Sequence, residues 1–300
     1  MQDFVHLHVH SQYSLLDGQA SIPRLVDKAI ADGMRGIAIT DHGNMFAIKE
    51  FWNYVKKKNG ARKDKIKELK SKIEALQAEL ESADSPTTEQ SAELAKMKAE
   101  LDSIPKEDFK AIIGCEVYVA RRAMHLKEEK QDQSGYHLIL LAKNKVGYHN
   151  LIKIVSRAWT EGYYMRPRTD RSDIEKYHEG LICCSACLGG EVPKRITNGD
   201  MEAAEEAVQW YKSIFGEDYY LELQLHKATV ERANHEAYEL QKVVNEKLLE
   251  LSDKYGVKLV CTNDVHFVDE ENAEAHDRLI CLSTGRDLDD PKRMLYSKQE

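Results

Sequence analysis

The sequence lacks the long apolar runs of a membrane protein and the excess of basic residues of a nucleic-acid coat protein. It contains no run of eighteen apolar residues, so we expect no membrane-spanning helix and no membrane partner. Acidic residues outnumber basic ones by 51 to 43, giving a net charge of −8. A chain of this charge is not a basic coat for nucleic acid. An anionic substrate would need a local basic patch or bound metal ions to hold it.

Disulfide and secretory signals are lacking as well. The six cysteines fall mostly in apolar stretches, so we expect reduced thiols and a cytoplasmic location. Cys184 and Cys187 form a single C-x-x-C pair, and the lack of a second pair argues against a zinc ribbon. The first residues have none of the basic, apolar and small-residue parts of a signal peptide.

An unusual concentration of imidazoles is present near the start, in the sequence VHLHVH. Alternate residues of a β-strand point to the same face, so His6, His8 and His10 would share one face while apolar residues occupy the other. Such a row suits a metal site. A cluster of buried, hydrogen-bonded histidines is the alternative.

The rest of the chain alternates between strand-like and helix-like patterns, which predicts parallel strands with crossover helices. Seven strands in about 250 residues favour a distorted (β/α)7 TIM-like barrel of the α/β class over an open, doubly wound sheet. The predicted strands are 5–10, 36–40, 111–119, 136–142, 180–185, 219–225 and 258–262. The predicted helices are 22–31, 46–57, 148–159, 201–215, 230–254 and 273–281.

One segment differs from its surroundings and predicts an insertion. From 59 to 106 the chain is rich in Lys, Glu, Ala and Leu, and its apolar residues recur every three or four positions. This pattern predicts an antiparallel, coiled-coil-like helical hairpin. We therefore expect a barrel built from 1–58 and 107–285, the hairpin between its two parts, and the beginning of a linker at 286–300.

Metal-ligating residue types lie at or near the end of every predicted strand. An isolated histidine at such a position is usually structural, but seven strands sharing the feature indicate a site, because barrel active sites gather at strand ends. The set is larger than one zinc ion requires. Two or three metals sharing carboxylates, as in phosphoester hydrolysis, are the natural interpretation.

Several motifs resemble those of the polymerase-and-histidinol-phosphatase (PHP) domain family: HLHVH, TDHGN, GCEVYV, YHLILLAKN and TNDVHF. More closely, HSQYSLLDG, YYMRPRTDRSDIEKYHEGLICCSACLGGEV and RMLYSKQE resemble the N-terminal domains of bacterial replicative DNA polymerase III alpha subunits. The resemblance implies a distorted (β/α)7 barrel. It also implies nine ligands for three metals, which here are His8, His10, Asp17, His42, Glu116, His137, Cys187, Asp264 and His266.

The resemblance further implies metal-dependent phosphodiester hydrolysis, as a 3′–5′ exonuclease that proofreads during DNA replication. We expect two to three divalent ions (zinc, manganese or magnesium), with Asp17, Glu116 and Asp264 as catalytic, metal-bridging carboxylates. The expected partners are the 3′ end of a DNA primer strand, the rest of a polymerase chain and other replisome subunits. The chain has no recognisable palm domain, so we expect it not to synthesise DNA alone.

Candidates for substrate contact lie outside the ligand set. Arg166 and Arg168 could hold phosphate, since guanidinium suits phosphate geometry, although an exposed loop explains them equally well. His226 is a candidate for contact with substrate or with a ligand, His6 for support of a ligand, and Tyr164 for stacking on a base. Two alternatives to the exonuclease remain: a stand-alone phosphatase acting on a small phosphomonoester, and a catalytically silent structural domain.

Overall fold

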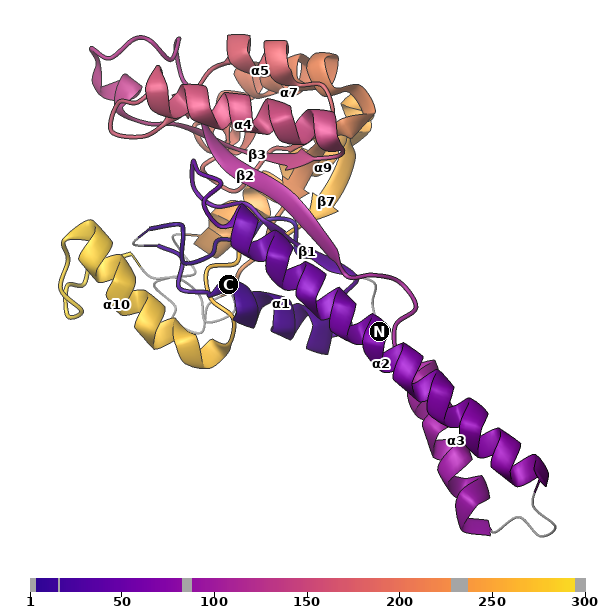
Figure 1. Cartoon of the computed structure of the whole chain (residues 1–300). Coiled ribbons are helices and arrows are strands. Elements are labelled where there is room, and N and C mark those ends of the chain that lie inside the picture. The colour runs from indigo at the N-terminus through magenta and orange to yellow at the C-terminus, as the bar shows by residue number, and fades with distance from the viewer. Residues whose placement is uncertain (1–3, 16, 83–87, 228–236, 295–300) are drawn as a thin grey trace.

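The computed structural model describes residues 4–15, 17–82, 88–227 and 237–294. Seven strands form one curled sheet in the order β1-β2-β3-β5-β6-β7, with β4 paired to β2 (Figure 1). Six of them match predicted strands closely, and the short β4 was not predicted. The strands are β1 Gly36–Ile39, β2 Lys110–Ala120, β3 Gly135–Ala142, β4 Arg168–Thr169, β5 Leu181–Cys184, β6 Tyr219–Leu223 and β7 Lys258–Cys261.

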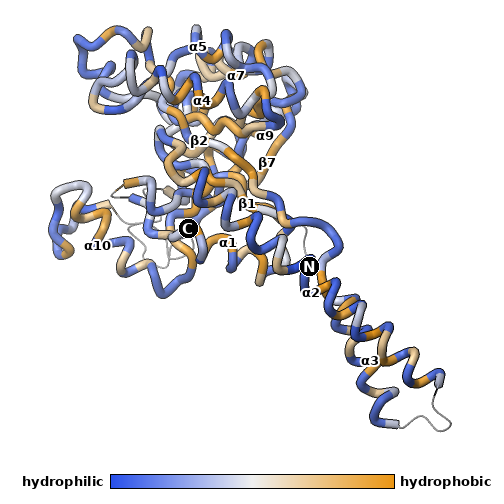
Figure 2. The backbone as a smooth tube through the Cα atoms, in the orientation of Figure 1, coloured by the Kyte–Doolittle hydropathy of each residue, from blue (hydrophilic) through white to orange (hydrophobic). Residues whose placement is uncertain are grey.

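Most of the helices pack around the sheet, and Figure 2 shows hydrophobic residues concentrated in the sheet. The helices predicted at 22–31 and 201–215 have the predicted bounds. Of the helix predicted at 230–254, residues 230–236 lie outside the described part, and α9 covers the rest from Glu239. The α-helices are α1 Ile22–Ala31, α2 Ile48–Ser82, α3 Thr88–Ser103, α4 Lys145–Thr160, α5 Arg171–Tyr177, α6 Glu191–Thr197, α7 Met201–Phe215, α9 Glu239–Tyr255 and α10 Ala273–Thr284. No described helix is both long enough and apolar enough to cross a membrane.

The sheet is mixed, which corrects the prediction of parallel strands throughout. Strand β3 runs antiparallel to both of its neighbours, β2 and β5, whereas the other paired strands are parallel. The connection from β2 to β3 contains only the short 3-10 helix η1, Lys130–Gln133. Parallel neighbouring strands usually need a helical crossover between them. Because β2 and β3 are antiparallel, a short connection without such a helix is enough to join them.

The predicted strand 5–10 is an extended segment with no regular ladder, and it joins the two edges of the sheet. On one side the backbone N–H of Thr40, just after β1, donates to Val9 O at 2.8 Å. On the other side the N–H of His10 donates to the carbonyl of Val265, after β7, at 2.7 Å. The segment thereby closes the curled sheet, which confirms a barrel-like α/β fold.

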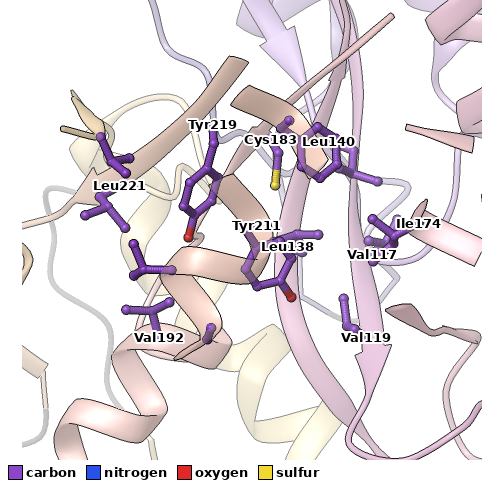
Figure 3. Packing of buried hydrophobic residues seen from close by; sticks show 14 of the residues in the cluster. Val117, Val119, Leu138, Leu140, Ile174, Cys183, Val192, Tyr211, Tyr219 and Leu221 are labelled. Atoms are coloured by element: carbon purple, nitrogen blue, oxygen red, sulfur yellow. The ribbon is translucent and has the colours of Figure 1, made fainter. Parts of the chain in front are cut away.

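Side chains along β2 and β3 point alternately to the two faces of the sheet, toward a hydrophobic layer on one face and toward the barrel interior on the other. Val117 and Val119 of β2, with Leu138 and Leu140 of β3, belong to the largest buried apolar cluster (Figure 3). The intervening residues point to the opposite face. Tyr118 pairs there with His137 across the antiparallel ladder, and Glu116 lies one pleat away.

The hairpin is present, but its first arm is not a separate helix. Helix α2 runs without a break for 35 residues, from the barrel into the projecting arm, so the predicted end of a helix at 57 was wrong (Figure 1). Helix α3 returns along α2, and Leu69 and Ile73 are buried in the arm. None of the described residues between 59 and 104 belongs to the buried clusters of the barrel. The predicted linker at 286–300 follows α10, and its last six residues lie outside the described part.

Candidate metal centre

The nine predicted ligands converge inside the curled sheet, and each comes from a segment that the fold directs there. Strands β2 and β3 supply Glu116 and His137 from their inward faces. The closing N-terminal segment and the turn after it carry His8, His10 and Asp17. Loops that follow β1, β5 and β7 supply the rest: His42, Cys187, Asp264 and His266.

Four side-chain atoms form a compact group at the centre of this site. The Nε2 atoms of His8 and His10 lie 3.1 Å apart, and Oδ1 of Asp264 lies 3.0 Å from the first and 3.1 Å from the second. Oε2 of Glu116 lies 2.8 Å from His8 Nε2 and 3.4 Å from His10 Nε2. Donors about 2.0 Å from a tetrahedral ion stand about 3.3 Å from one another. The group therefore has the dimensions of a cation's ligand shell.

The second oxygen of Glu116 faces a neighbouring group. Its Oε1 lies 2.7 Å from His137 Nδ1 and 3.0 Å from His42 Nδ1. The thiol of Cys187 approaches the same His137 nitrogen at 3.6 Å. A single buried carboxylate thus connects two groups of potential ligands, which is the arrangement expected of a residue that bridges two metals.

Asp17 connects the first two groups to a third, made of His10, His42 and His266. One carboxylate oxygen of Asp17 lies 2.9 Å from His42 Nε2, and the other lies 3.4 Å from His266 Nε2. The ring of His10 stacks on those of His42 and His266, with centroids 4.0 and 4.5 Å away. All nine predicted residues therefore share one continuous site.

Burial and charge act in opposite directions on the groups at the centre. Burial alone would lower the pKa of His8, but Asp264 and Glu222 raise it well above its ordinary value. Burial would likewise raise the pKa of Asp264, yet His8 and His10 hold it well below its usual range. Burial would raise the pKa of Glu116 also, and His137 and His42 depress it. The carboxylates are therefore ionised at neutral pH, as metal ligation requires.

His266 differs from His8. Burial, with a contribution from His10, lowers the pKa of His266 to about 3, so its ring is neutral at physiological pH. The pKa of Asp17 is also depressed: burial would raise it, but hydrogen bonds from His276 and His42 outweigh that effect. A neutral imidazole and an ionised carboxylate are both ready to bind a cation without losing a proton.

Glu222 contacts a predicted ligand, and the sequence analysis missed it. Its Oε1 lies 2.6 Å from Nδ1 of His8, and both side chains are fully buried. Gln224 and Thr262 donate to the same oxygen. A carboxylate on the far nitrogen fixes the ring of a ligating histidine and makes it a stronger ligand. The one available signal was the alternation in LELQLH, which places Glu222 and Gln224 on the same face of β6.

A second missed set fixes His10. The hydroxyl of Ser14 lies 3.0 Å from His10 Nδ1 and donates to Asp41 Oδ1 at 2.8 Å. Asp41 also accepts from the backbone N–H and the hydroxyl of Ser11. These contacts leave Nε2 of His10 facing the centre. His276, to which the sequence analysis gave no role, has its Nε2 3.9 Å from Asp17 Oδ1.

The sequence model of the PHP domain matches residues 6–226 of this chain. The chain belongs to the PHP domain family. It is 39% identical over 300 residues to the DNA polymerase III subunit alpha of Borreliella burgdorferi, covering 99% of this chain and 21% of that protein. For the subunit of the same name from Treponema pallidum, the identity is 36%, covering 99% of this chain and 20% of that one. The chain thus spans about a fifth of the length of these relatives.

A solved amidohydrolase from Chromobacterium violaceum is also similar to this PHP domain, with a TM-score of 0.42 and 14% identity. The match covers 88% of this chain and 87% of that one. So distant a likeness supports no conclusion about function.

Backbone features of the PHP domain hold two of the candidate ligands in place. Asp264 has φ 52°, in the left-handed region that aspartate tolerates better than most residues, and this turn aims its carboxylate inward. A Cβ on Gly189 would lie 2.8 Å from Nδ1 of His137. Only glycine therefore lets the loop after β5 pass so close to that ring.

The predicted substrate residues divide into different environments. The prediction for Arg168 was wrong: its guanidinium is completely buried and donates to the carbonyls of Gly162, Met124 and Leu126. It ties loops together and is not accessible to a substrate. Arg166 is exposed, with its guanidinium carbon 5.9 Å from the centre of the Tyr118 ring. It remains a candidate.

Three further residues are also placed by the structure. His226 is buried and hydrogen-bonds to Gln241 of α9 through both its backbone N–H and its Nδ1. Tyr164 packs against the buried Arg168. His6 stands edge-on to Phe4, and its Nδ1 has no hydrogen-bond partner among the described residues, so the expectation that it supports a ligand was wrong.

Proposed function

We propose that this PHP domain binds two to three divalent cations and hydrolyses phosphodiester bonds at the 3′ ends of DNA. One observation carries the proposal: the donor atoms of His8, His10 and Asp264 stand 3.0–3.1 Å apart, Oε2 of Glu116 lies 2.8 and 3.4 Å from the two histidine nitrogens, and its other oxygen reaches a second group of candidate ligands. Zinc, manganese and magnesium are the candidate ions, because the donor set mixes nitrogen, sulfur and oxygen.

The chain's own residues supply the binding and the orientation. Glu116, Asp17 and Asp264 would be the carboxylates that hold the cations, and Glu222 and Ser14 hold the rings of His8 and His10. When bound, the cations would offset the phosphate charge and lower the pKa of water toward neutrality. His8 and His42 must lose their protons before they can ligate, so loading depends on pH.

The relatives support DNA as the substrate, since those listed above are named DNA polymerase III subunit alpha. In this proposal the chain is the N-terminal PHP part of such a subunit, and 286–300 leads toward its polymerase part. The partners are then the primer 3′ end, the rest of that chain and other replisome subunits. The location is the bacterial cytoplasm, and the activity is proofreading.

A test of the proposal combines metal analysis with a degradation assay. The purified chain should contain two to three equivalents of metal and shorten a 5′-labelled single-stranded oligonucleotide one nucleotide at a time. Chelation should abolish the shortening, and Asp264→Asn should do so while circular dichroism shows an intact fold. Glu217→Gln changes an exposed carboxylate far from the ligand set and serves as the matched control.

Other results would assign the site differently. Rapid hydrolysis of a small phosphomonoester without action on the oligonucleotide would indicate a stand-alone phosphatase. Bound metal with no hydrolysis of either substrate would indicate a structural domain.

A further inference from the structure

Three aromatic side chains form an exposed row beside the metal centre. The rings of Trp159 and Tyr163 are stacked, with centroids 5.5 Å apart and planes 19° apart. Phe46 continues the row on the other side of Trp159, at 6.3 Å. The residues are 59% (Phe46), 43% (Trp159) and 48% (Tyr163) exposed, although aromatic side chains this large are normally well buried.

The row is attached to the loop that carries a predicted ligand. The indole N–H of Trp159 donates to the carbonyl of Gly43 at 2.8 Å, and Gly43 directly follows His42. Gly43 has φ 61°, and a Cβ there would lie 2.6 Å from Pro167 Cγ. The end of α4 and the loop before α2 are therefore packed together next to the site, and the Trp159 ring is held in a fixed orientation.

A positively charged side chain lies close to the same loop. Arg166 is three residues beyond Tyr163, and its guanidinium lies over the Tyr118 ring, whose centroid is 6.2 Å from that of His42. Arg166 makes no ion pair with any described residue, in a chain where many surface arginines and lysines do. An exposed, unpaired guanidinium beside a predicted phosphate-cleaving site is a natural contact for the next phosphate along a strand.

We propose that Phe46, Trp159 and Tyr163 form a platform on which unpaired bases of single-stranded DNA stack, with Arg166 contacting the backbone. The inference rests on the proposed function and extends it by giving the strand a route to the metal centre. Stacked rings with exposed faces suit bases, because every base offers a flat face whatever its sequence. Bases inside a duplex already stack on their neighbours, so the platform selects single strands.

The first test measures binding without cleavage. A fluorescent (dT)12 is titrated with the 300-residue chain in EDTA, which prevents metal-dependent hydrolysis. Tyr163→Ala should weaken binding about fivefold or more, the equivalent of about 1 kcal/mol for one stacked base. Tyr163→Phe keeps the ring and should restore the affinity. Trp159→Phe keeps an aromatic ring but loses the hydrogen bond to Gly43. This variant therefore separates the contribution of base stacking from that of the support given to the loop after His42.

The matched control is Trp52→Ala. Trp52 is an exposed aromatic residue too, at 52%, but it lies on α2 and lines a separate hollow with Ile113 and Tyr148. This variant should bind (dT)12 as the unaltered chain does. A blunt duplex of the same length should compete poorly for the platform.

A second measurement separates this inference from the proposed function. In the presence of metal, Tyr163→Ala should raise KM for the oligonucleotide about fivefold and leave metal content as it was. Unchanged affinity and KM in Tyr163→Ala would overturn the inference, and would point to a protein surface covering the row instead. If the chain binds (dT)12 through Tyr163 but cleaves no DNA, the platform stands and the proposed function fails.

Discussion

Glu116 concentrates the chemistry of the site in one side chain. It is fully buried, one oxygen faces His8 and His10, and the other faces His42 and His137. Its ionised state depends on those histidines, and their orientation depends in turn on a surrounding layer of hydrogen bonds. The residues outside the ligand set therefore govern how well the site holds metal.

Glu222→Gln tests that layer directly. The amide can still accept from His8, but it lacks the charge that makes the imidazole a stronger ligand, so metal affinity should fall about 10- to 100-fold. Titration against a chromophoric chelator measures the loss. Glu217→Gln, at a carboxylate 80% exposed, should leave the affinity unchanged. Equal affinity in the two variants would show that Glu222 has no part in holding metal.

Proton release on metal binding follows from the pKa shifts. The pKa values of His8 and His42 are raised in the folded protein, so both rings are protonated at pH 7. Their protonation stabilises the metal-free fold. That stabilisation is complete below about pH 6.5 and is lost as pH rises through the raised pKa values of the folded state. Burial also raises the pKa of the Cys187 thiol. A cation must displace these protons, so binding should release at least two of them and strengthen as pH rises.

Calorimetric titration in two buffers of different ionisation enthalpy measures that release. His266, with its pKa near 3, and the ionised Asp17 should contribute none at pH 7. Metal binding with no proton uptake by the buffer would mean that His8 and His42 are not ligands.

The nine candidate ligands were predicted because the motifs that carry them resemble those of the PHP family, and the structure does bring them together. Their ligation of metal stays a prediction. Glu222 was not found, because a glutamate alternating with leucines resembles the solvent-facing side of a strand. Arg168 was misjudged for a related reason: the sequence RPR does not show that one guanidinium turns inward to three carbonyls while Arg166 stays outside.

At the scale of elements, alternation predicted six of the seven strands, but not the direction of β3. The direction of β3 depends on how the connection 121–134 folds, and the apolar residues of that segment show no regular spacing that would predict its structure. Helix α2 was divided wrongly at residue 57 because apolar spacing changes where the helix leaves the barrel for the arm. The helical backbone continues across that change even though Asn59 and Gly60 are residue types that often end a helix.

The arm should be removable without loss of the metal centre. Lys65 pairs with Glu100 at 2.7 Å, so the two helices already lie side by side where residues 67–98 could be replaced by a short Gly/Ser loop. Such a loop costs little closure entropy. Metal content measured by mass spectrometry should match that of the full chain. Loss of metal would show that the arm supports β2 and Glu116.

The base of the arm, by contrast, should matter for stability. The side-chain amide of Asn59 donates to the carbonyl of Phe109 and accepts from its N–H, both at 2.9 Å, and so fastens α2 to the start of β2. Asn59→Ala should lower the free energy of unfolding by about 1–2 kcal/mol in urea denaturation. Ser82→Ala, near the far end of α2, should cost much less.

At the scale of the whole molecule, the candidate metal centre draws on most parts of the sheet. Ligands come from the N-terminal segment, from β2 and β3, and from loops after β1, β5 and β7. Metal binding should therefore stabilise the entire barrel and not a single loop. The arm lies outside this unit, because its described residues between 59 and 104 share none of the barrel's buried clusters.

Thermal unfolding should report this coupling. A cation at 100 times its Kd stabilises the folded state by about 2.7 kcal/mol per site, so added zinc or manganese should raise Tm and EDTA should lower it. The same titration on His10→Ala should give a much smaller rise. Equal rises in both proteins would indicate that the ions act on other sites.

The closing segment has a consequence for the order in which the protein is made. Val9 bridges to Val265, so the sheet cannot close until synthesis has passed that residue. Until then His8 and His10 lack Asp264 and His266, and the central group of ligands does not exist. Pairing across so long a stretch of chain is slow to form. A nascent chain halted before β7 is therefore a barrel with an open seam, and it should acquire its metals only after synthesis has passed that point.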